Sequence, residues 1–470
     1  MATSAWCRLI LAVVAAVTTS ATQYPLKFAD DRLHALIPIR IGTPPQNLTF
    51  IVDTSTSDLV IFTDSSICGS QCFNHTRSSS FRTGTSLGVD TSRAAFELEI
   101  DGATVNNSGR TMVGTDIVRV GDDLQATLVY IGVDKLQIWR GSGPDRFQTF
   151  QGVDGLIGLA YSSLQRVYCL DPHDESCTQF RRLAGLDTGH FDIFTLDLGE
   201  ETPVLGIGNI SDEYKPVIQW GSQNPYDKPY VHRFTVFDLT VCGANLFANY
   251  SGHQWEALID TGASCLRLPA EFFDMVMAWI PSVHYDSEPM PCWVPANATK
   301  TLPKLTFQLN PAGPLLFLPL DQLLLPMGNG SARLCISRDI PIAQSMESPP
   351  SITFGALAMR AFYAAFDLEA VRFGMANRLS LNTTMPETCS AVVQCHGQQR
   401  RWIPMNRCLD PDCTGYLVRH FDSATKTCTL FFASEMVVYV MVGSLLLAEL
   451  TLHALYWRQC RKIIASVPSY

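Results

Sequence analysis

The chain has 470 residues and a formal net charge of −10; 47% of its residues are hydrophobic and only 17% are charged. This composition is too apolar for a disordered chain, and the acidic balance argues against a nucleic-acid-binding protein, which usually presents a basic face. The sequence has no phosphate-binding GxxxxGK[ST] loop, no GxGxxG turn and no HExxH motif, so nucleotide enzymes and zinc proteases are excluded too.

Residues 1–21 have the pattern of a secretory signal peptide. Arg8 precedes the apolar run LILAVVAAV, and Thr19 and Ala21 occupy the small-residue positions before a cleavage site. An N-terminal membrane anchor is the alternative, but this apolar run is short for a membrane span. We therefore expect the chain to enter the secretory pathway.

Residues 24–377 have a pattern typical of β-structure. Short alternating or apolar runs, among them LIPIRI, LTFIVD, ATLVYIGV and KLTFQL, are separated by clusters of Gly, Pro and Asn. Helical patterns are few here, and the clearest covers residues 270–280. The sequence therefore predicts an all-β fold.

The cysteines indicate an oxidising compartment. Setting aside Cys7 in the signal peptide and Cys460 near the C-terminus, 13 of the 15 cysteines remain, so most should be paired and one left free or shared with another chain. Cys169 and Cys177 bracket the polar loop LDPHDES and are expected to pair; a metal site there is the weaker alternative.

The sequence does not decide the pairing of two further cysteines. Cys242 and Cys265 could pair with each other or stay separate. Cys265 comes five residues after Asp260, but no His lies close by in the sequence to activate it, so we interpret it as structural.

Residues 379–430 differ in composition from the β region. They show little apolar periodicity and contain five cysteines, namely Cys389, Cys395, Cys408, Cys413 and Cys428. We expect a small disulfide-stapled module, or stalk.

Residues 436–457 form a mostly apolar segment long enough to cross a lipid bilayer as a helix. Three basic residues follow at once, Arg458, Arg461 and Lys462. We therefore expect a single-pass type I membrane protein with a cytosolic tail, 458–470, and an extracellular or lumenal ectodomain. Within the span, Glu449 and His453 lie one helical turn apart, where they either mark a partner contact or snorkel to the cytosolic end.

Eight Asn-X-Ser/Thr sequons agree with a lumenal or extracellular ectodomain. The glycosylation candidates are Asn47, Asn74, Asn106, Asn209, Asn249, Asn297, Asn329 and Asn382.

A weak internal repeat divides the β region. LTFIVDTSTSDLVIF (48–62) is echoed by EALIDTGASCLRLP (256–269), each an apolar strand that runs into Asp-Thr and then a second apolar strand. Each copy is followed by an apolar segment around a glycine, VDGLIGLAY (153–161) and SITFGALAMRAFYAAFD (351–367). The repeat predicts a duplicated β-lobe, with halves at 24–198 and 199–378.

Asp53 and Asp260 end the two repeated strands. Carboxylates from equivalent turns can meet across a two-fold axis, and within about 3 Å of each other they share one proton. The ionised member can then take a proton from a water while the protonated member donates to a carbonyl under attack. A single Asp-Thr is often only a turn at a strand end, but two in matched contexts favour this acid–base chemistry.

At these residues the chain resembles the pepsin-like family of aspartic proteases. The similarity covers about three quarters of the chain and includes LIPIRIGTPPQNLTFIVDT, VDGLIGLAY, ALIDTGAS and FGALAMRAFYAAFDLEAVRFGMA. The resemblance implies a bilobal all-β fold with a central cleft and polypeptide substrates, with no cofactor and no metal. Asp53 and Asp260 would be the catalytic pair and a bound water the nucleophile. Residues Thr54, Ser55, Thr56, Thr261 and Gly262 would support them.

The resemblance also implies disulfides and a flap. Cys68 would pair with Cys72, and Cys292 with Cys335. Residues 96–100 and 111–120 would be the arms of a hairpin over the cleft, with Asp101 and Gly102 near its tip. The family's flap Tyr and its partner Trp are both missing; Val60 stands at the Trp position.

Two departures lie beside the aspartates. Ser55 stands where the family has Gly; if the position needs a positive φ, its Cβ costs roughly 1–2 kcal/mol. Ala263 replaces a hydroxyl residue that bonds the second aspartate, which should raise the pKa of Asp260, whereas Thr56 keeps the equivalent hydroxyl for Asp53. These departures and the changed flap leave an alternative open, a catalytically impaired pseudoprotease that acts as a surface binding or scaffold protein.

Overall fold

The computed structural model describes most of the chain between Thr22 and Ala465. The described residues are 22–29, 33–63, 68, 72–83, 97–100, 103–107, 111–133, 136–138, 152–160, 183, 193–199, 201–222, 232–281, 284–285, 292–295, 302–326, 331–339, 351–381, 387–413, 419–430 and 432–465. The chain divides into two compact units, Met1–Ser390 and Ala391–Tyr470. The predicted signal peptide lies outside the described residues.

The first half of the first unit is built on an eight-stranded sheet. In spatial order its strands are β2 (Lys27–Phe28), β3 (Ala35–Ile41), β4 (Gln46–Asp53), β12 (Gly155–Gly158), β5 (Leu59–Phe62), β10 (Leu124–Val133), β9 (Thr111–Val120) and β6 (Arg82–Thr83). Along β3, buried Ala and Ile side chains alternate with more exposed ones, as expected of a strand with one face on the core. The last four residues of β4 are all buried, so the strand carries Asp53 into the interior.

The second half repeats this arrangement. Its sheet has the order β23 (Leu316–Pro319), β22 (Lys304–Gln308), β16 (Arg233–Val241), β18 (Gln254–Asp260), β27 (Ile352–Gly355), β19 (Leu266–Pro269) and β26 (Ile336–Asp339), and β17 (Ala244–Asn245) pairs with β16. Helix α3 (Ala270–Trp279) follows β19 and buries one apolar face, which confirms the helix predicted at 270–280. The described part of this unit also contains short helical turns: η1 (His75–Arg77), η8 (Ser251–His253), η9 (Leu320–Leu323) and α4 (Ala356–Met359).

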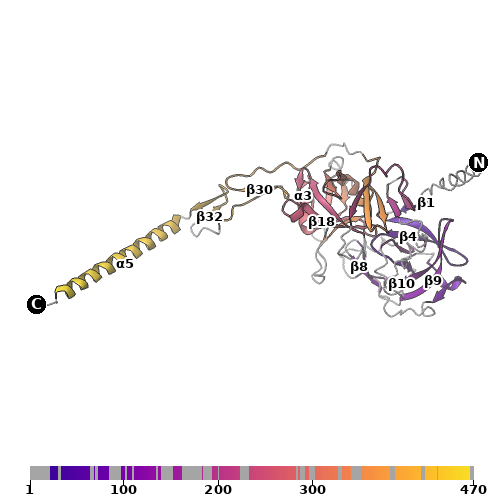
Figure 1. The fold of residues 1–470 in the computed structure, drawn as a ribbon, viewed down its shortest axis with the longest axis horizontal. Helices are drawn as coiled ribbons and strands as arrows, with labels where there is room; N and C mark the ends of the chain where they lie inside the picture. Colours follow the sequence, from indigo (N-terminus) through magenta and orange to yellow (C-terminus); the bar gives the residue numbers. More distant parts are fainter. Residues whose placement is uncertain are drawn as a thin grey trace, which may run out of the picture. The chain divides into compact units, whose positions relative to one another are not determined.

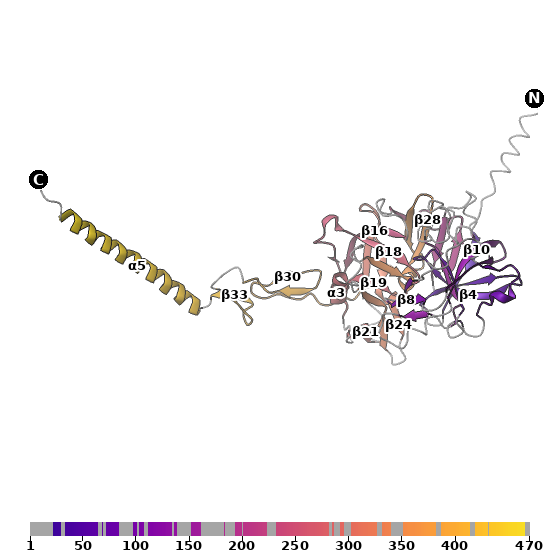
Figure 2. The same cartoon turned by 90° about the horizontal axis from the view of Figure 1, so that it is seen from below.

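The two halves are equivalent at the repeated motifs. Strand β12 runs parallel to β4 with Gly158 opposite Asp53, and β27 runs parallel to β18 with Gly355 opposite Asp260. A Cβ on either glycine would lie 2.3 Å from a backbone oxygen of the neighbouring turn, so only Gly fits there. The duplicated β-lobe is confirmed. Figures 1 and 2 show β4 and β10 on one side of this unit, and β18 and α3 on the other.

A six-stranded sheet joins segments from both halves. Its order is β1 (Thr22–Pro25), β14 (Val204–Ile207), β13 (Ile193–Asp197), β28 (Phe362–Asp367), β29 (Arg372–Asn377) and β15 (Gln219–Ser222). Phe194 of β13 stacks on Phe366 of β28, with ring centroids 4.4 Å apart. This sheet anchors the halves to each other through a buried aromatic core.

The hairpin expected over the cleft differs from the prediction in its second arm. Strand β7 (Glu97–Ile100) pairs with β8 (Ala103–Asn107), and β11 (Leu136–Ile138) joins the outer side of β8. The predicted arm 111–120 is β9, which pairs with β10 along its whole length. The prediction was wrong because Ile100 pairs with Ala103, so β8 and not β9 is the partner of β7. Asp101 and Gly102 lie outside the described residues.

A four-stranded sheet lies in the second half of this unit. Its order is β20 (His284–Tyr285), β21 (Cys292–Pro295), β25 (Ser331–Leu334) and β24 (Leu324–Pro326). In this sheet, Cys292 lies in register opposite Leu334.

The disulfides confirm one inferred pair and correct another. Cys68 pairs with Cys72 as expected. Cys335 pairs with Cys265, not with Cys292, because β19 and β26 are parallel neighbours that begin side by side, which brings the Cα atoms of Cys265 and Cys335 to 4.7 Å. Cys242 pairs with Cys389. Cys169 and Cys177 lie outside the described residues.

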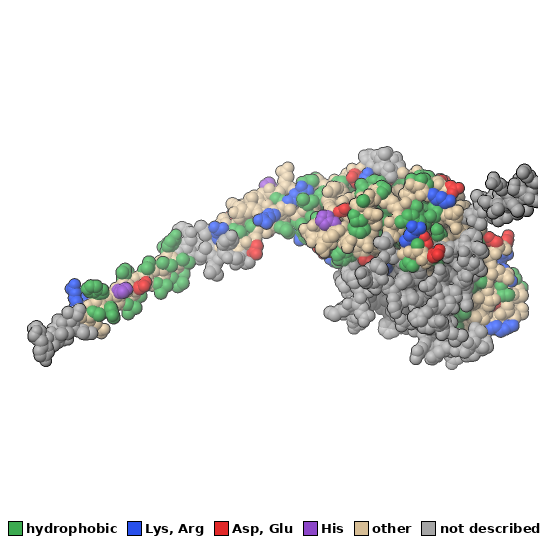
Figure 3. All heavy atoms as spheres, in the orientation of Figure 1, with side chains coloured by type: hydrophobic (Ala, Val, Ile, Leu, Met, Phe, Trp, Pro, Cys, Tyr) green, Lys and Arg blue, Asp and Glu red, His purple; other side chains and the backbone are tan. Residues whose placement is uncertain are grey.

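The second unit contains two disulfide-closed hairpins and a long helix. Strands β30 (Arg400–Trp402) and β31 (Arg407–Leu409) form the first hairpin, closed by Cys395–Cys408; β32 (Arg419–Asp422) and β33 (Thr427–Leu430) form the second, closed by Cys413–Cys428. Helix α5 (Phe432–Ala465) follows, and its 27-residue stretch Met436–Lys462 is long and apolar enough to cross a bilayer. Hydrophobic side chains cover α5 in Figure 3.

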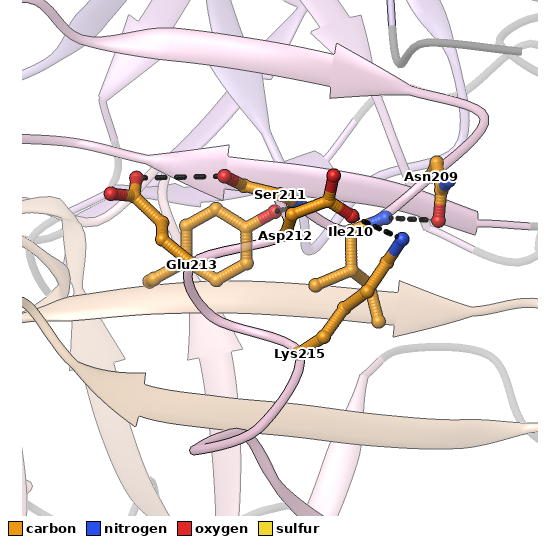
Figure 4. Close-up of polar contacts among 7 residues, drawn as sticks. Asn209, Ile210, Ser211, Asp212, Glu213 and Lys215 are labelled. Carbon is orange, nitrogen blue, oxygen red and sulfur yellow. Dashed lines mark hydrogen bonds and ion pairs between the residues drawn. The ribbon is translucent and has the colours of Figure 1, made fainter. Parts of the chain in front are cut away.

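Four predicted glycosylation sites have described side chains. Asn47, Asn74 and Asn249 are exposed, while Asn209 is partly buried. Figure 4 shows the turn that begins at Asn209, in which Asn209 accepts a hydrogen bond from the N–H of Ile210, and Lys215 pairs with Asp212 at 2.6 Å. The side chain of Asn106, in β8, and all of Asn297, Asn329 and Asn382 lie outside the described residues.

Candidate active site

Asp53 ends β4 and is fully buried. Its Oδ1 accepts two hydrogen bonds from Ser55, from the backbone N–H at 2.7 Å and from the hydroxyl at 2.7 Å. Its Oδ2 is also buried but has no hydrogen-bond partner among the described residues. One oxygen of this carboxyl is therefore fixed by hydrogen bonds, and the other is available to accept one.

Asp260 ends β18, at the equivalent place in the second half, and only 6% of its surface is exposed. Its Oδ1 accepts a hydrogen bond from the N–H of Ala263 at 3.1 Å. The Ser55 hydroxyl acts on both carboxyls, since it also lowers the pKa of Asp260, but only Asp53 accepts the N–H of Ser55 as well.

The second turn lies directly against the first carboxyl. A Cβ on Gly262 would fall 2.7 Å from both Cγ and Oδ2 of Asp53. The charge of Asp53 also raises the pKa of Asp260. The structure therefore brings together the two aspartates that the repeat predicts, and Gly262 makes their approach possible.

Thr54 and Thr261 link the two turns across the halves. The N–H of each donates to the Oγ1 of the other at 3.1 Å. The Thr54 hydroxyl donates to the carbonyl of Ile259 at 3.0 Å, and the Thr261 hydroxyl to that of Val52 at 2.7 Å. These buried bonds join the backbones beside the two aspartates, as the resemblance implies for these threonines.

The pKa values of both carboxyls are raised, chiefly because burial penalises their charged forms. For Asp53, hydrogen bonds from Ser55 and the N–H of Thr56 act in the opposite direction. For Asp260, burial and the charge of Asp53 raise the pKa to about 7, against a smaller lowering by Arg267. Such an environment holds a proton on the pair at acidic and near-neutral pH.

Ser55 is not strained. It is not among the non-glycine residues with positive φ, so its Cβ causes no backbone strain at this position. Its side chain instead adds a hydroxyl bond to Asp53, where a glycine could offer only its N–H. This departure from the family pattern strengthens the hydrogen bonding of the first aspartate.

The expected role of the Thr56 hydroxyl needs correction. Its Oγ1 accepts the N–H of Asp58 at 3.4 Å, and the hydroxyl of Ser55 takes its place on Asp53. The Ser55 hydroxyl and N–H both bond Oδ1 of Asp53, while the Thr56 hydroxyl oxygen is engaged by the N–H of Asp58. At Ala263 the backbone N–H remains as a donor to Asp260 although the hydroxyl is missing.

Sequence reasoning missed a buried histidine beside the pair. His34 is fully buried, and its Nε2 lies 3.1 Å from the carbonyl oxygen of Gly262. Its charge lowers the pKa of Asp53. A single His before a strand carries no local signal of such a contact, because its partner lies 228 residues further along the chain.

One group of potential metal ligands occurs among the described residues, formed by Cys242, Glu387 and Cys389. Both sulfurs belong to one disulfide, so neither can act as a thiolate ligand. The group is a structural link and no candidate for metal chemistry.

The sequence model of the eukaryotic aspartyl proteases matches residues 35–378, which include both aspartates. This chain belongs to that family. Pepsin A from Rhinolophus ferrumequinum is 26% identical over 341 residues, covering 72% of this chain and 79% of the relative. Chymosin from Callithrix jacchus is 27% identical, covering 73% and 80%, and gastricsin from Homo sapiens is 24% identical, covering 76% and 84%. For an aspartyl protease of this family the substrates are polypeptides.

Proposed function

We propose that this aspartyl protease is a catalytically active endopeptidase in which Asp53 and Asp260 activate a water molecule. The observation that carries the proposal is the reciprocal bonding of Thr54 and Thr261, which fixes the two carboxyl-bearing turns against each other. Burial of both carboxyls supplies the proton sharing that the reaction needs.

The hydrogen bonding favours Asp260 as the member that carries the proton. Asp53 receives the N–H and hydroxyl of Ser55 and the N–H of Thr56, which stabilise its ionised form, whereas Asp260 has the N–H of Ala263 and shares the Ser55 hydroxyl. In this assignment Asp53 takes a proton from the water as it attacks the peptide carbonyl. Asp260 donates its proton to the carbonyl oxygen. Asp53 then gives the proton it took from the water to the amide nitrogen, a hydroxyl proton of the tetrahedral intermediate returns to Asp260, and the C–N bond breaks to release the amine.

We also propose that α5 anchors the enzyme in a membrane as a single-pass type I protein with a cytosolic tail. Its apolar stretch is long enough to span the hydrocarbon core, and basic residues cluster at its C-terminal end. Paired cysteines throughout the described part of the ectodomain favour the secretory pathway over the cytosol. The eight sequons are proposed glycosylation sites on the same side.

The test uses the full-length chain purified in detergent micelles. Cleavage of an unfolded protein is followed from about pH 3 to pH 8, with and without a statine-type inhibitor. We expect cleavage that the inhibitor blocks, and we expect it to be lost in both Asp53→Asn and Asp260→Asn while both variants remain folded. Asp212→Asn, the same chemical change at the exposed turn of Figure 4, serves as the matched control and keeps wild-type activity.

The alternative function, a pseudoprotease that binds peptides without turnover, gives a different result. Such a protein would bind the inhibitor but cleave nothing at any pH. The hydroxyl that Ser55 contributes to Asp53 argues for the enzyme, because it stabilises the ionised carboxyl that abstracts the proton.

A further inference from the structure

Helix α5 carries two ionisable side chains inside its apolar stretch, Glu449 and His453. Both are exposed on the surface of the helix, and neither has a hydrogen-bond or ion-pair partner in the described part of the chain. Figure 3 shows an acidic side chain and a His side chain next to each other among the hydrophobic side chains of α5. In a bilayer both groups would face hydrocarbon unless another molecule covers them.

The Ser and Thr hydroxyls of the same stretch are satisfied within the helix. The hydroxyl of Ser444 donates to the carbonyl of Met441 at 2.9 Å. The hydroxyl of Thr451 lies 2.9 Å from the carbonyl oxygen of Leu447 and 2.8 Å from that of Ala448. The carboxyl and the imidazole make no such bond, so in lipid they need a partner from outside the helix.

The depth of Glu449 prevents it from reaching water. It lies nine residues before Arg458, the first basic residue after the span. At 1.5 Å per residue this is about 13–14 Å along the helix, close to half of a ~30 Å hydrocarbon core. Snorkelling serves long Lys and Arg side chains near helix ends, and a Glu side chain near the midplane is too short for it.

The two groups complement each other. The imidazole of His453 and the carboxyl of Glu449 form a hydrogen bond whichever of them holds the proton, as N–H to carboxylate oxygen or as carboxyl O–H to ring nitrogen. A second copy of the chain has the same orientation in the membrane and presents both groups at the same depth. A different partner helix would need only one complementary group, so the presence of both favours a second copy.

The spacing also places both residues in one helical seam. Contact residues of a parallel two-stranded coiled coil alternate at spacings of three and four, and Glu449 and His453 are four apart. In a two-fold symmetric pair, Glu449 of each copy then lies against His453 of the other. The repeat extends in both directions from the pair, through Tyr439, Val442, Leu446, Tyr456 and Cys460.

We infer that α5 is an interface between two copies of this chain: two parallel α5 helices pair in the bilayer, and Glu449 of each hydrogen-bonds to His453 of the other. The inference rests on the proposed membrane anchoring. It does not depend on the catalytic activity of the protease unit.

The first experiment measures association of the full-length chain in mild detergent micelles. Energy transfer between donor- and acceptor-labelled copies is followed over a range of protein-to-detergent ratios. Glu449→Leu and His453→Leu keep the helix apolar but remove one member of each hydrogen bond, so each should raise the dimer dissociation constant by about tenfold.

Thr451→Val is the matched control. It removes a polar group at a similar depth whose hydroxyl is bonded within its own helix. Its dissociation constant should equal that of the wild type.

The second experiment identifies the face of α5 that forms the contact. Cys460 is the free cysteine among the described residues, and oxidation of isolated membranes with copper phenanthroline and oxygen should join two copies through it. The linked dimer should be absent in Cys460→Ser. Moving the cysteine back by one residue, with Cys460→Ser and Gln459→Cys together, turns it about 100° around the helix and should lower the yield about fivefold.

An anchored chain that stays monomeric overturns the inference and leaves the proposed anchoring intact. A dimer that both Leu variants leave unchanged, or that Thr451→Val weakens equally, overturns it as well, as does equal crosslinking from position 459, because another surface then joins the copies. Release of the chain from membranes by alkaline carbonate overturns the proposed anchoring, and the interface falls with it.

Discussion

Thr54 and Thr261 each donate a backbone N–H to the side-chain oxygen of the other, so two residues 207 positions apart form a closed and nearly symmetric pair. Both hydroxyls then donate to the carbonyl that precedes the opposite aspartate. Every one of these groups is buried. The relative position of the two carboxyls is therefore set by hydrogen bonds between backbone groups and short hydroxyl side chains, and does not depend on the flexible ends of long side chains.

Removing one of these hydroxyls should weaken the whole protease unit. Thr261→Val keeps the shape of the side chain but leaves the carbonyl of Val52 and the N–H of Thr54 unsatisfied in the interior. We expect the free energy of unfolding to fall by about 2–4 kcal/mol, measured by denaturant titration, with a parallel loss of activity. Thr261→Ser retains the hydroxyl, so its free energy of unfolding and its activity should fall much less.

The pair should also be energetically coupled. In a double-mutant cycle of Thr54→Val and Thr261→Val, the second substitution should lower the free energy of unfolding by less than it does in the wild type. The reason is that its hydrogen-bond partner has already been removed. A coupling of about 1–3 kcal/mol is expected in unfolding experiments. Strictly additive losses would show that the two hydroxyls act independently.

Ser55 and Gly262, the residues directly after each Asp-Thr, should differ in how much activity is lost when each is changed to Ala. Ser55→Ala removes one donor to Asp53 without steric conflict, so the pKa of this carboxyl rises and the acid limb of kcat/KM moves to higher pH, with a modest loss at the plateau. Gly262→Ala places a methyl group 2.7 Å from the same carboxyl and should abolish activity at all pH values. Similar effects of both changes would contradict this asymmetry.

The repeat and its two aspartates could be predicted from sequence because they depend on short, recurring patterns. A buried strand that ends in Asp-Thr occurs twice, and each copy has its own later apolar-Gly segment, with which it pairs in parallel. Helix α3 was predictable for the same reason, since its apolar face repeats with helical spacing.

The features that were missed depend on contacts between distant segments. The bridge between Cys265 and Cys335 follows from the parallel pairing of β19 with β26, which no local pattern near either cysteine reveals. The contact of His34 with Gly262 has the same origin. For the hairpin, both 103–107 and 111–120 have strand character, and only the long register of β9 with β10 decides between them.

The disulfide pattern gives a prediction that needs no activity. Peptide mapping of the non-reduced chain should recover Cys265 joined to Cys335, and Cys242 joined to Cys389. The second bridge closes a loop of about 147 residues, so loss of both its cysteines by Cys242→Ser with Cys389→Ser should lower the free energy of unfolding by up to about 5 kcal/mol. A peptide that joins Cys292 to Cys335 would contradict the assignment.

His232 should make the protease unit sensitive to acid. Burial lowers the pKa of His232 to about 4, below its ordinary value of 6.5, so the unfolded chain takes up a proton first as the pH falls. The stabilisation is thus complete above pH 6.5 and is lost progressively toward pH 4, by about 3 kcal/mol. Asp154 and Asp260, with pKa values raised to about 6 and about 7, act in the opposite sense and favour the folded state as the pH falls.

The variant His232→Gln separates these contributions. Gln keeps a donor for the carbonyl of Leu159 but loses the packing against Phe194 and Phe366, so it should be less stable than the wild type at pH 7. Because Gln does not titrate, that deficit should shrink by about 2–3 kcal/mol when both proteins are unfolded at about pH 4.5. Denaturant titrations at the two pH values measure the difference directly. A deficit that is the same at both would mean that His232 has the same pKa in the folded and unfolded states.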